Sequence, residues 1–373
     1  MIEIREVLSR KEQKIFATFN YKMYRNVPYA VPDLITDELD SFNMKKNPAY
    51  DYCDVKQYLA YKNGKCVGRI AAIVSKAANE KWDTKRIRFS RVDFIDDYEV
   101  SAALFNAVEE YGRSCGLTQI HGPLGFSDMD QQGMLVEGFK EPGMFITIYN
   151  HPYYIKHLEK LGYVKDIDWV EYKVMLPDKP NERIKKLSHA VLRRFKLTLV
   201  EPKTRNEIKS YLPQVFRVIN ICYKDLYGTV ELTKAQIMKY YKEFILLINP
   251  EYVKFLVDER GELVAFGLGM PSLNEAVKRS RARLFPFGWY RLLRAPKAKA
   301  EVLDLYLVGV IPSMQNKGLT AVLLNSMSNV AAKNGIVHAE TGPELETNHQ
   351  VQALWKHFET VQHKRRRCWV KNL

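Results

Sequence analysis

The chain is poor in cysteine, and its cysteines form no motif. Its 373 residues include five, no two of which stand in a C-x-x-C pair: Cys53, Cys66, Cys115, Cys222 and Cys368. This pattern excludes a zinc ribbon and a dithiol redox motif, and it favours a reducing compartment. The first residues, Met1–Arg5, lack the basic-then-apolar order of a signal peptide. We therefore expect a cytoplasmic protein.

Long hydrophobic runs are also absent. The longest are short stretches such as Phe244–Ile248, whereas a membrane-spanning helix needs about 20 apolar residues. Hydrophobic residues nevertheless make up 46% of the chain and aromatic residues 12%. The chain is therefore not disordered, and either half is long enough to bury a core. The sequence predicts a soluble or at most peripheral protein with no transmembrane segment.

Acidic residues are scarce in the second half only. Of the 57 Lys and Arg residues 33 follow position 178, but only 17 of the 43 Asp and Glu residues do. The net charge of +14 therefore lies wholly in that half. Such asymmetry indicates an anionic partner, namely nucleic acid, lipid head groups or a phosphorylated cofactor. A solvated surface is the alternative interpretation.

The predicted elements occur in the same order on both sides of a Pro-rich segment at 177–180. Each side begins with a strand and a helix, continues with a hairpin, and then alternates strands and helices. The fold class is therefore α/β, with two domains, 1–178 and 179–373, each a mixed central sheet flanked by helices. Residues 27–52 predict an irregular loop, residues 144–148 a strand, and residues 274–299 a basic insertion.

The most specific pattern is Val308–Thr320, where a buried strand ends at Pro312 and a short loop leads into a helix. Gly318 has no side chain, so an anion can approach the backbone there. The free N–H groups and dipole of the first helical turn favour that anion, and Lys317 adds a positive charge. The segment has neither a Walker loop nor a G-x-G-x-x-G fingerprint. A plain strand–loop–helix connection is the alternative.

With Gln315, Gly318 and Thr320 at the positions of a Q-x-x-G-x-G/A motif, this segment resembles the GNAT acyltransferases. Asn348, Leu354 and Trp355 stand at the Asn, Leu and Tyr positions of that family's late helix. The resemblance implies acetyl-CoA or a longer acyl-CoA as donor, with its pyrophosphate in the loop and its pantetheine arm beside the strand. The cofactor-binding residues that it implies are Val308, Gly309, Val310, Gln315, Asn316, Lys317, Gly318, Leu319, Thr320 and Asn348.

Trp355 departs from the family pattern. It replaces the tyrosine that protonates the departing thiolate, and an indole is not a general acid. The departure therefore implies a different acid, water, or no catalysis at all.

The first half resembles the same fold through Asn150 and the ending Leu158–Tyr163 of its late helix. Where a phosphate loop would follow the strand 86–95, however, the chain reads Asp96-Asp97-Tyr98-Glu99. Carboxylates suit a helix N-terminus but repel a pyrophosphate. We expect no CoA in the first half. The whole chain resembles bacterial tandem GNAT-like proteins.

Amide formation from a thioester needs a base for the amine proton and donors for the oxyanion. The candidates are Asp304 and Tyr306, on one face of the strand leading to Val310, and Glu340 at the end of the next strand. The alternative is that Asp304 faces solvent and Tyr306 packs in the core.

Four further polar residues lie near these strands. Glu344 and Glu346 either bind a cationic substrate or are solvated, and His338 and His357 are interpreted as packing or surface residues. No group of His, Cys, Asp or Glu has metal-ligand spacing, so no metal is predicted.

The insertion 274–299 interleaves aromatic residues with cations: Lys278, Arg279, Arg281, Arg283, Arg291 and Arg294 surround Phe285, Phe287, Trp289 and Tyr290. This composition fits RNA contact, an anionic membrane interface or a lid over the CoA phosphates. A solvated loop with its own small core is the alternative. The basic tail His363–Trp369 is interpreted as a guarded strand edge or as further binding charge.

The leading hypothesis is a CoA-dependent N-acyltransferase that acts on a small-molecule or peptide amine. One alternative is an aminoacyl-tRNA-dependent transferase of the same tandem fold, which the basic second half favours. The other is a non-catalytic CoA-binding module, which Trp355 favours.

Overall fold

The computed structural model describes residues 1–177, 182–356 and 358–373. The first half contains β1 (Ile2–Glu6), α1 (Arg10–Tyr24), α2 (Ile35–Ser41), β2 (Cys53–Lys62), β3 (Lys65–Ser75), α3 (Lys76–Lys81), β4 (Arg86–Phe94), α4 (Tyr98–Ser114), β5 (Gln119–Gly122), β6 (Met134–Glu137), α5 (Tyr153–Lys160) and β7 (Val164–Met175). The boundary predicted at 178/179 and His357 lie outside the described residues.

The second half contains α6 (Glu182–Arg194), β8 (Thr198–Val200), α7 (Arg205–Tyr223), α8 (Lys234–Phe244), β9 (Val253–Val257), β10 (Leu263–Pro271), α9 (Asn274–Arg279), α10 (Gly288–Arg294), β11 (Val302–Val310), α11 (Leu319–Lys333), β12 (His338–Thr341), β13 (Glu344–Leu345), α12 (His349–Trp355) and β14 (Thr360–Asn372). Short 3-10 turns occupy Pro48–Asp51, Pro250–Tyr252, Ala295–Lys297 and Pro312–Met314.

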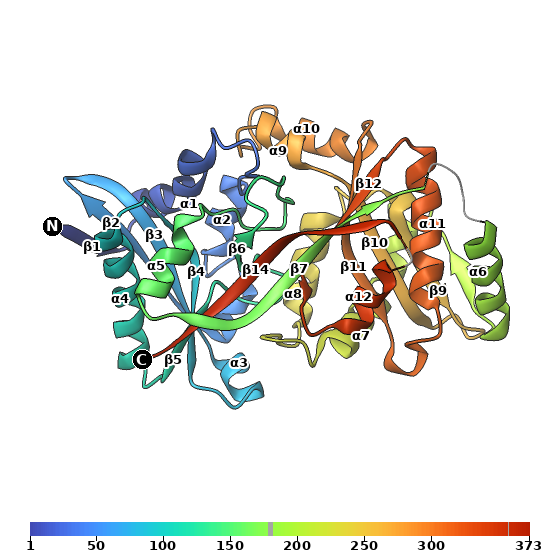
Figure 1. Ribbon diagram of the computed structural model, residues 1–373, viewed down its shortest axis with the longest axis horizontal. Coiled ribbons are helices and arrows are strands. Elements are labelled where there is room, and N and C mark those ends of the chain that lie inside the picture. Colours follow the sequence, from blue (N-terminus) through green and yellow to red (C-terminus); the bar gives the residue numbers. More distant parts are fainter. Residues whose placement is uncertain (178–181, 357) are drawn as a thin grey trace.

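The strands of the described residues form one mixed, 14-stranded sheet (Figure 1). Strands β1 to β5 follow one another from one edge, β8 to β12 follow one another from the other, and β14 and β7 lie in the middle. β4 pairs with β5 and β11 pairs with β12 in parallel. Both halves thus have the same strand order, which confirms the predicted α/β class with flanking helices.

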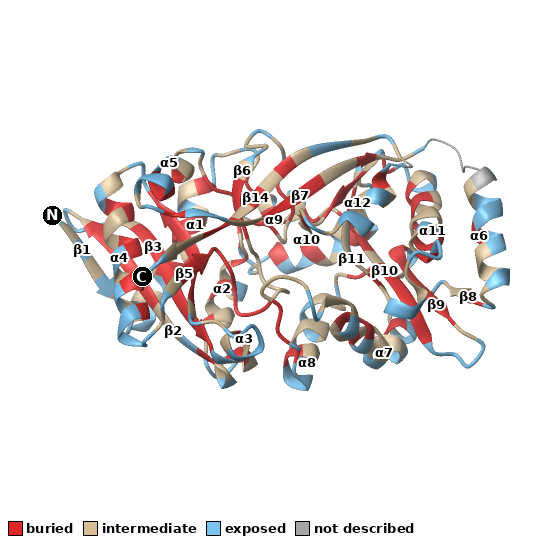
Figure 2. Ribbon diagram, turned by 60° about the horizontal axis from the view of Figure 1, so that its bottom comes forward, coloured by how far each residue is buried: buried red, intermediate tan, exposed pale blue. Residues whose placement is uncertain are grey.

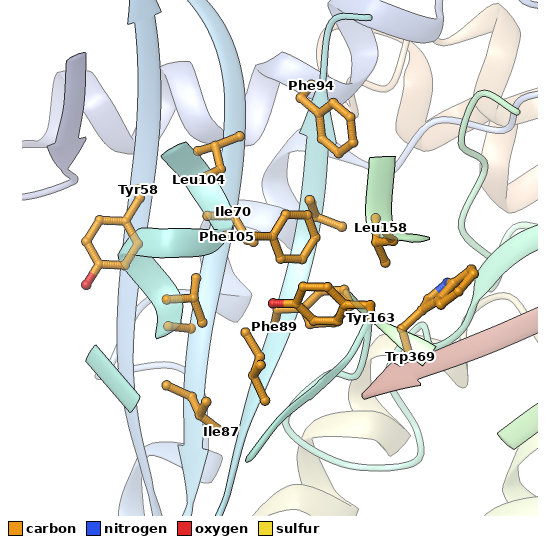
Figure 3. Packing of buried hydrophobic residues seen from close by; sticks show 14 of the residues in the cluster. Tyr58, Ile70, Ile87, Phe89, Phe94, Leu104, Phe105, Leu158, Tyr163 and Trp369 are labelled. Carbon is orange, nitrogen blue, oxygen red and sulfur yellow. The ribbon is translucent and has the colours of Figure 1, made fainter. Parts of the chain in front are cut away.

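Two long strands join the halves. β7 and β14 pair antiparallel along their length, and Figure 1 shows them crossing the middle of the molecule side by side. β14 also pairs with β5 of the first half, while the end of β7 pairs with β12 of the second half. Trp369 of β14 consequently packs into the first-half core with Phe89 and Tyr163 (Figure 3).

The basic tail is therefore not an edge strand, and that interpretation is wrong. Lys364 and Arg366 lie on one face of β14, are buried, and pair with Glu171 of β7. Arg365 lies on the opposite face and pairs with Asp168. The tail is basic because β7 presents carboxylates to both faces of β14, which the sequence pattern of the tail alone does not indicate.

Helices cover the sheet with apolar stripes. In α4 the buried side chains Val100, Leu104 and Val108 recur at four-residue spacing, as expected for one face of a helix. Figure 2 shows the buried residues in the strands and on the inner sides of helices, whereas α6 is largely exposed. No helix in the described ranges has both the length and the apolarity needed to cross a bilayer.

The structure differs from the predicted elements at several segments. Residues 27–52 include α2, residues 144–148 form turns rather than a strand, α6 was not predicted, and the basic insertion folds into α9 and α10. Tertiary contacts explain α2, whose Glu38 is buried and accepts hydrogen bonds from Arg69 and Arg91. A short polar helix of this kind has no local hydrophobic period that would predict it.

Candidate functional site

The central strands of the second half separate at the candidate site. β11 and β12 pair over only four residues, from Val302 with His338 to Leu305 with Thr341. Immediately beyond, the register of β11 against β10 shifts, and Tyr306 has no partner in the ladder. Such a bulge disrupts the ladder and re-aims side chains. From Tyr306 onward, the edge of β11 is not paired with β12.

Alternate peptide groups of β11 point to this unpaired edge. The N–H of Ile311 donates to β10, so the antiparallel ladder places the Gly309 peptide group toward β10 as well. Val308 and Val310 direct their peptide groups to the opposite edge. The resemblance implies that Val308, Gly309 and Val310 offer main-chain hydrogen bonds to a pantetheine arm. In the structure, the peptide groups of two of them, Val308 and Val310, point to the unpaired edge of β11.

Side chains of α7 already occupy the acceptors of this edge. The Tyr223 hydroxyl donates to the Val308 carbonyl at 3.0 Å, and the Cys222 thiol donates to the Val310 carbonyl at 3.0 Å. The N–H groups of Val308 and Val310 have no acceptor among the described residues. The edge therefore offers two free N–H donors, which suits a carbonyl oxygen.

The loop after β11 presents a row of free donors. Asn316 and Gly318 have φ of 60° and 81°, and Gly318 caps α11 without any side-chain hydrogen bond. The N–H groups of residues 316–321 have no acceptor in the part of the chain that the structure describes. Consecutive free amides and the positive end of a 15-residue helix favour a bound anion. The loop therefore fits the pyrophosphate of CoA.

The side chains of this loop hold its shape instead of lining an open cleft. Gln315 donates to the Val310 carbonyl at 3.2 Å, and the Lys317 ammonium donates to the Ser313 carbonyl at 2.7 Å. Leu319 is buried in the core. The groups of this loop that are free to bind a pyrophosphate are therefore mainly its backbone N–H groups.

The unpredicted helix α6 also contributes to the loop. Phe195, which follows α6, has Lys317 5.2 Å from its ring and Arg194 5.4 Å from the same ring. A Cβ added at Gly318 would lie 3.3 Å from Val191. Lys317 and Arg194 thus both lie beside Phe195, and a side chain at Gly318 would press on Val191 of α6.

Asn348 begins α12, and its side-chain oxygen accepts from the Val351 N–H at 3.4 Å. Trp355, at the other end of this helix, donates its indole N–H to both oxygens of Glu344, at 2.9 and 3.0 Å. Burial raises the pKa of Glu344 to about 8, so this carboxyl group is protonated at neutral pH. Glu346, by contrast, pairs with Lys165 at 2.7 Å.

Asp304 is fully buried and does not face solvent, whereas Tyr306 is partly buried and only its hydroxyl group is enclosed. Neither oxygen of Asp304 nor the Tyr306 hydroxyl has a hydrogen-bond partner among the described residues. Burial, together with the neighbouring charge of Glu340, raises the pKa of Asp304 to about 7. An unpaired buried carboxyl group with a pKa near neutrality is a candidate general base.

Glu340 lies beside Asp304 in the parallel ladder but has a different environment. Although burial opposes ionisation, hydrogen bonds from His338 and His363 and the charge of Lys364 hold the pKa of Glu340 well below its usual range. The Lys364 ammonium lies 3.3 Å from Glu340 and 3.0 Å from Glu171. Of the three predicted catalytic residues, Glu340 is thus a permanently charged neighbour, and Asp304 is the group poised to change protonation.

The corresponding region of the first half is filled. The Asp97 side chain caps α4 and pairs with Lys62 at 2.6 Å. The Tyr154 hydroxyl accepts from the Phe94 N–H at 2.9 Å, and the Tyr153 hydroxyl donates to the Phe94 carbonyl. A cavity of only about 20 Å³ remains nearby. Negative charge at the helix start and tyrosines on the strand edge make this half a poor place for a pyrophosphate.

A group with metal-ligand chemistry does exist, built from residues that are far apart in sequence. Donor atoms of His121, Asp166 and Cys368 lie within 4.8 Å of one another. The Tyr227 hydroxyl contacts all three, at 2.9, 2.5 and 3.5 Å, and Arg86 pairs with Asp166. The Tyr227 hydroxyl and the Arg86 guanidinium thus already contact the polar atoms that would otherwise be free to bind a metal ion.

Several residues of the site have no signal in the sequence. Tyr223 and Cys222 reach β11 from a helix some 85 positions earlier, and Lys364 reaches Glu340 from the last strand. The sequence carried one signal for the Trp355–Glu344 pair. Trp355 stands where the family pattern has a tyrosine, and Glu344 is a carboxylate that comes shortly before its helix.

Two curated proteins match nearly the whole chain. Protein YghO of Escherichia coli K12 is 27% identical over 376 residues, which cover 99% of this chain and 95% of that protein. The bacterial ceramide synthase of Caulobacter vibrioides is 25% identical over 374 residues, covering 97% and 95%. No protein-family model matches the chain.

Solved structures share the fold. The tandem GNAT protein from the clavulanic acid biosynthesis pathway superposes with a TM-score of 0.57 at 12% identity, covering 100% of this chain and 98% of that one. A GCN5-related N-acetyltransferase from Sphaerobacter thermophilus superposes with a TM-score of 0.51 at 10% identity, covering 100% and 95%. With its separated parallel strands and its free-amide loop, the chain shares the fold of tandem GNAT proteins and GCN5-related N-acetyltransferases.

Proposed function

We propose that this protein transfers an acyl group from an acyl-CoA to an amine, forming an amide. The observation that carries the proposal is the row of free N–H groups at residues 316–321, next to the free N–H groups of Val308 and Val310. The second half, from about residue 179, would bind the donor. The first half, whose equivalent region is filled, would complete the acceptor site or serve as a scaffold.

For each step of the reaction we propose a residue that would assist it. An acyl-CoA supplies an acyl group activated as a thioester. The Val308 and Val310 N–H groups would donate to the carbonyl oxygen, whose negative charge grows as the amine nitrogen bonds to carbon. Asp304 would take the proton that the nitrogen loses, since its pKa of about 7 leaves much of it ionised at neutral pH.

Departure of the sulfur requires a proton, and Glu344 is our candidate for its source. Trp355 itself does not release a proton, but it holds a carboxyl group that stays protonated to about pH 8. As the C–S bond breaks, Glu344 would protonate the thiolate and later regain a proton from solvent. Amide and free CoA are then the products, and no metal is needed.

The acceptor side of the site is apolar. Around Tyr306 lie buried side chains from both halves: Val31, Leu34, Met270, Leu273, Val277 and Leu292. A ceramide is an amide of a long-chain amino alcohol, and one relative is named for making it. Among amine acceptors we therefore place long-chain amino alcohols first and polar peptides second. The five unpaired cysteines favour a cytoplasmic setting, where acyl-CoA occurs.

The direct test is isothermal titration of the purified chain with acetyl-CoA, palmitoyl-CoA and desulfo-CoA. We expect binding of at least one, followed by amide formation with a panel of long-chain and short amines. Absence of binding by all three to folded protein would refute the proposal. Tight binding without turnover would instead support the CoA-binding module. Strongly salt-dependent tRNA binding would support the aminoacyl-tRNA alternative.

A further inference from the structure

The insertion between β10 and β11 exposes large apolar side chains. Phe285, Phe287, Trp289 and Tyr290 are 74%, 67%, 45% and 47% exposed. Single exposed hydrophobic residues are ordinary on a protein surface, but four aromatic residues within six positions form a patch. In Figure 1 the insertion's helices α9 and α10 stand at the upper border of the molecule.

Buried side chains and backbone hydrogen bonds on the inner side of the insertion hold the patch in place. Leu273, Val277 and Leu292 are buried against residues of both halves. The Ala282 carbonyl accepts from the Ile35 N–H at 2.9 Å, and the Asn274 amide donates to the Gly143 carbonyl at 2.7 Å. The aromatic side chains therefore project outward from an anchored support and cannot turn inward into this core.

The charge around the patch has one sign. Between residues 276 and 300 the chain contains eight Lys and Arg residues and no Asp or Glu. The cations that are exposed in the structure are Arg279, Arg281, Arg283, Arg291, Arg294, Lys297 and Lys299. Such a ring of positive charge around exposed aromatic residues is complementary to a surface that combines anionic groups with an apolar interior.

We propose that the segment 274–299 docks on an anionic lipid bilayer, inserting Phe285 and Phe287 below the head groups. Trp289 and Tyr290 would lie at head-group level, where amphipathic rings are enriched. The surrounding arginines would bind lipid phosphates. The inner side of the same segment covers Tyr306, so docking would bring the membrane next to the proposed acceptor site.

The polar atoms of the patch favour a bilayer over RNA. The Trp289 indole N–H donates to the Pro286 carbonyl at 3.0 Å, and the Tyr290 hydroxyl accepts from Arg294 at 2.8 Å. The Trp289 indole can therefore enter an interface without losing a hydrogen bond to water. Recognition of unpaired bases, in contrast, uses such groups to contact base edges. Docking is independent of the acyl-transfer proposal, because vesicle binding needs no acyl donor.

The test is flotation of the full-length protein with vesicles of phosphatidylcholine alone and of phosphatidylcholine with phosphatidylglycerol. We expect binding to the anionic vesicles only. F285S/F287S should reduce the partition coefficient by about tenfold or more, and R281Q/R283Q should weaken binding and reduce its salt dependence. Matched controls are L8S/M44S, at positions that are 80% and 74% exposed elsewhere, and K185Q/K186Q on α6, both without effect.

Fluorescence gives a second readout. Of the five tryptophans, Trp169, Trp355 and Trp369 are buried, and Trp82 is 37% exposed. In W82F protein the exposed emission comes from Trp289, and it should shift to the blue on addition of anionic vesicles. Three results would overturn the proposal: no binding to anionic vesicles, binding that F285S/F287S leaves unchanged, or tighter binding to single-stranded RNA than to vesicles at equal salt.

Discussion

The indole N–H of Trp355 donates to both carboxyl oxygens of Glu344, at 2.9 and 3.0 Å. The pair links the start of β13 with the end of α12, at the position where the superfamily resemblance places a tyrosine acid. Burial raises the pKa of Glu344 to about 8, and the indole hydrogen bond opposes part of that rise. Burial therefore keeps Glu344 a neutral carboxylic acid despite this hydrogen bond, at a place where the indole itself offers no transferable proton.

The first prediction concerns this pair. Because Glu344 must be protonated to act, kcat/KM should fall as the pH rises through about 8. W355F removes the hydrogen bond that lowers the pKa, so this alkaline limb should move to higher pH. E344Q should lose the limb and reduce kcat by about 10²-fold or more. E346Q, two residues away at a carboxylate that pairs with Lys165, is the control, and an unchanged alkaline limb in W355F would contradict the assignment.

The second prediction concerns Asp304 as the base. Its carboxylate must be ionised, so kcat/KM should rise with pH through about 7. D304N should lower kcat/KM by about 10²- to 10⁴-fold and abolish this acid limb, while acyl-CoA affinity measured by titration stays unchanged. Y306F tests the neighbouring hydroxyl separately. If D304N retained a normal rate and profile, the base would have to be sought elsewhere.

The third prediction tests the raised pKa of Asp304 through protein stability, independently of any role in catalysis. Its folded pKa of about 7 exceeds the value of about 3.9 in an unfolded chain. The folded state therefore holds the proton more tightly, and stability declines as the pH rises from about 4 to 7. Asparagine mimics the protonated form. The gain in unfolding free energy of D304N over the unsubstituted protein should grow by about 2 kcal/mol between pH 5.5 and pH 8.

Urea unfolding at the two pH values measures this difference, and it requires no substrate. A gain that is the same at both values would mean that Asp304 is ionised throughout and paired with a cation.

The fourth prediction concerns the phosphate loop. Gly318 has φ of 81°, and an added Cβ would lie 3.3 Å from Val191. G318A should weaken acyl-CoA binding by about tenfold or more, because the loop must shift and misdirect its free N–H groups. G261A is the matched control, with φ of 78° and open space around the position. It should lose about 1 kcal/mol of stability through the same strained backbone and retain full affinity.

The sequence by itself determined the elements whose signals are local. The hydrophobic strand Val302–Val310, the loop with Gly318 and the helix after it lie where the residue pattern predicts them, since strand period, a helix-starting glycine and helical spacing act within a few residues. The repeated order of elements likewise predicted the α/β class. The charge of Asp97 at the start of α4 also indicated that this helix start differs from the start of α11 in the second half.

Only the tertiary structure decided which groups meet. The exchange of β7 and β14 between the halves places Lys364 beside Glu340, and no local period specifies the pairing of strands almost two hundred positions apart. The environments of Asp304 and Glu344 also depend on the tertiary structure. The pKa of a carboxyl group is set by its burial and by its neighbours in space, and the residues adjacent to it in the chain specify neither of these two factors.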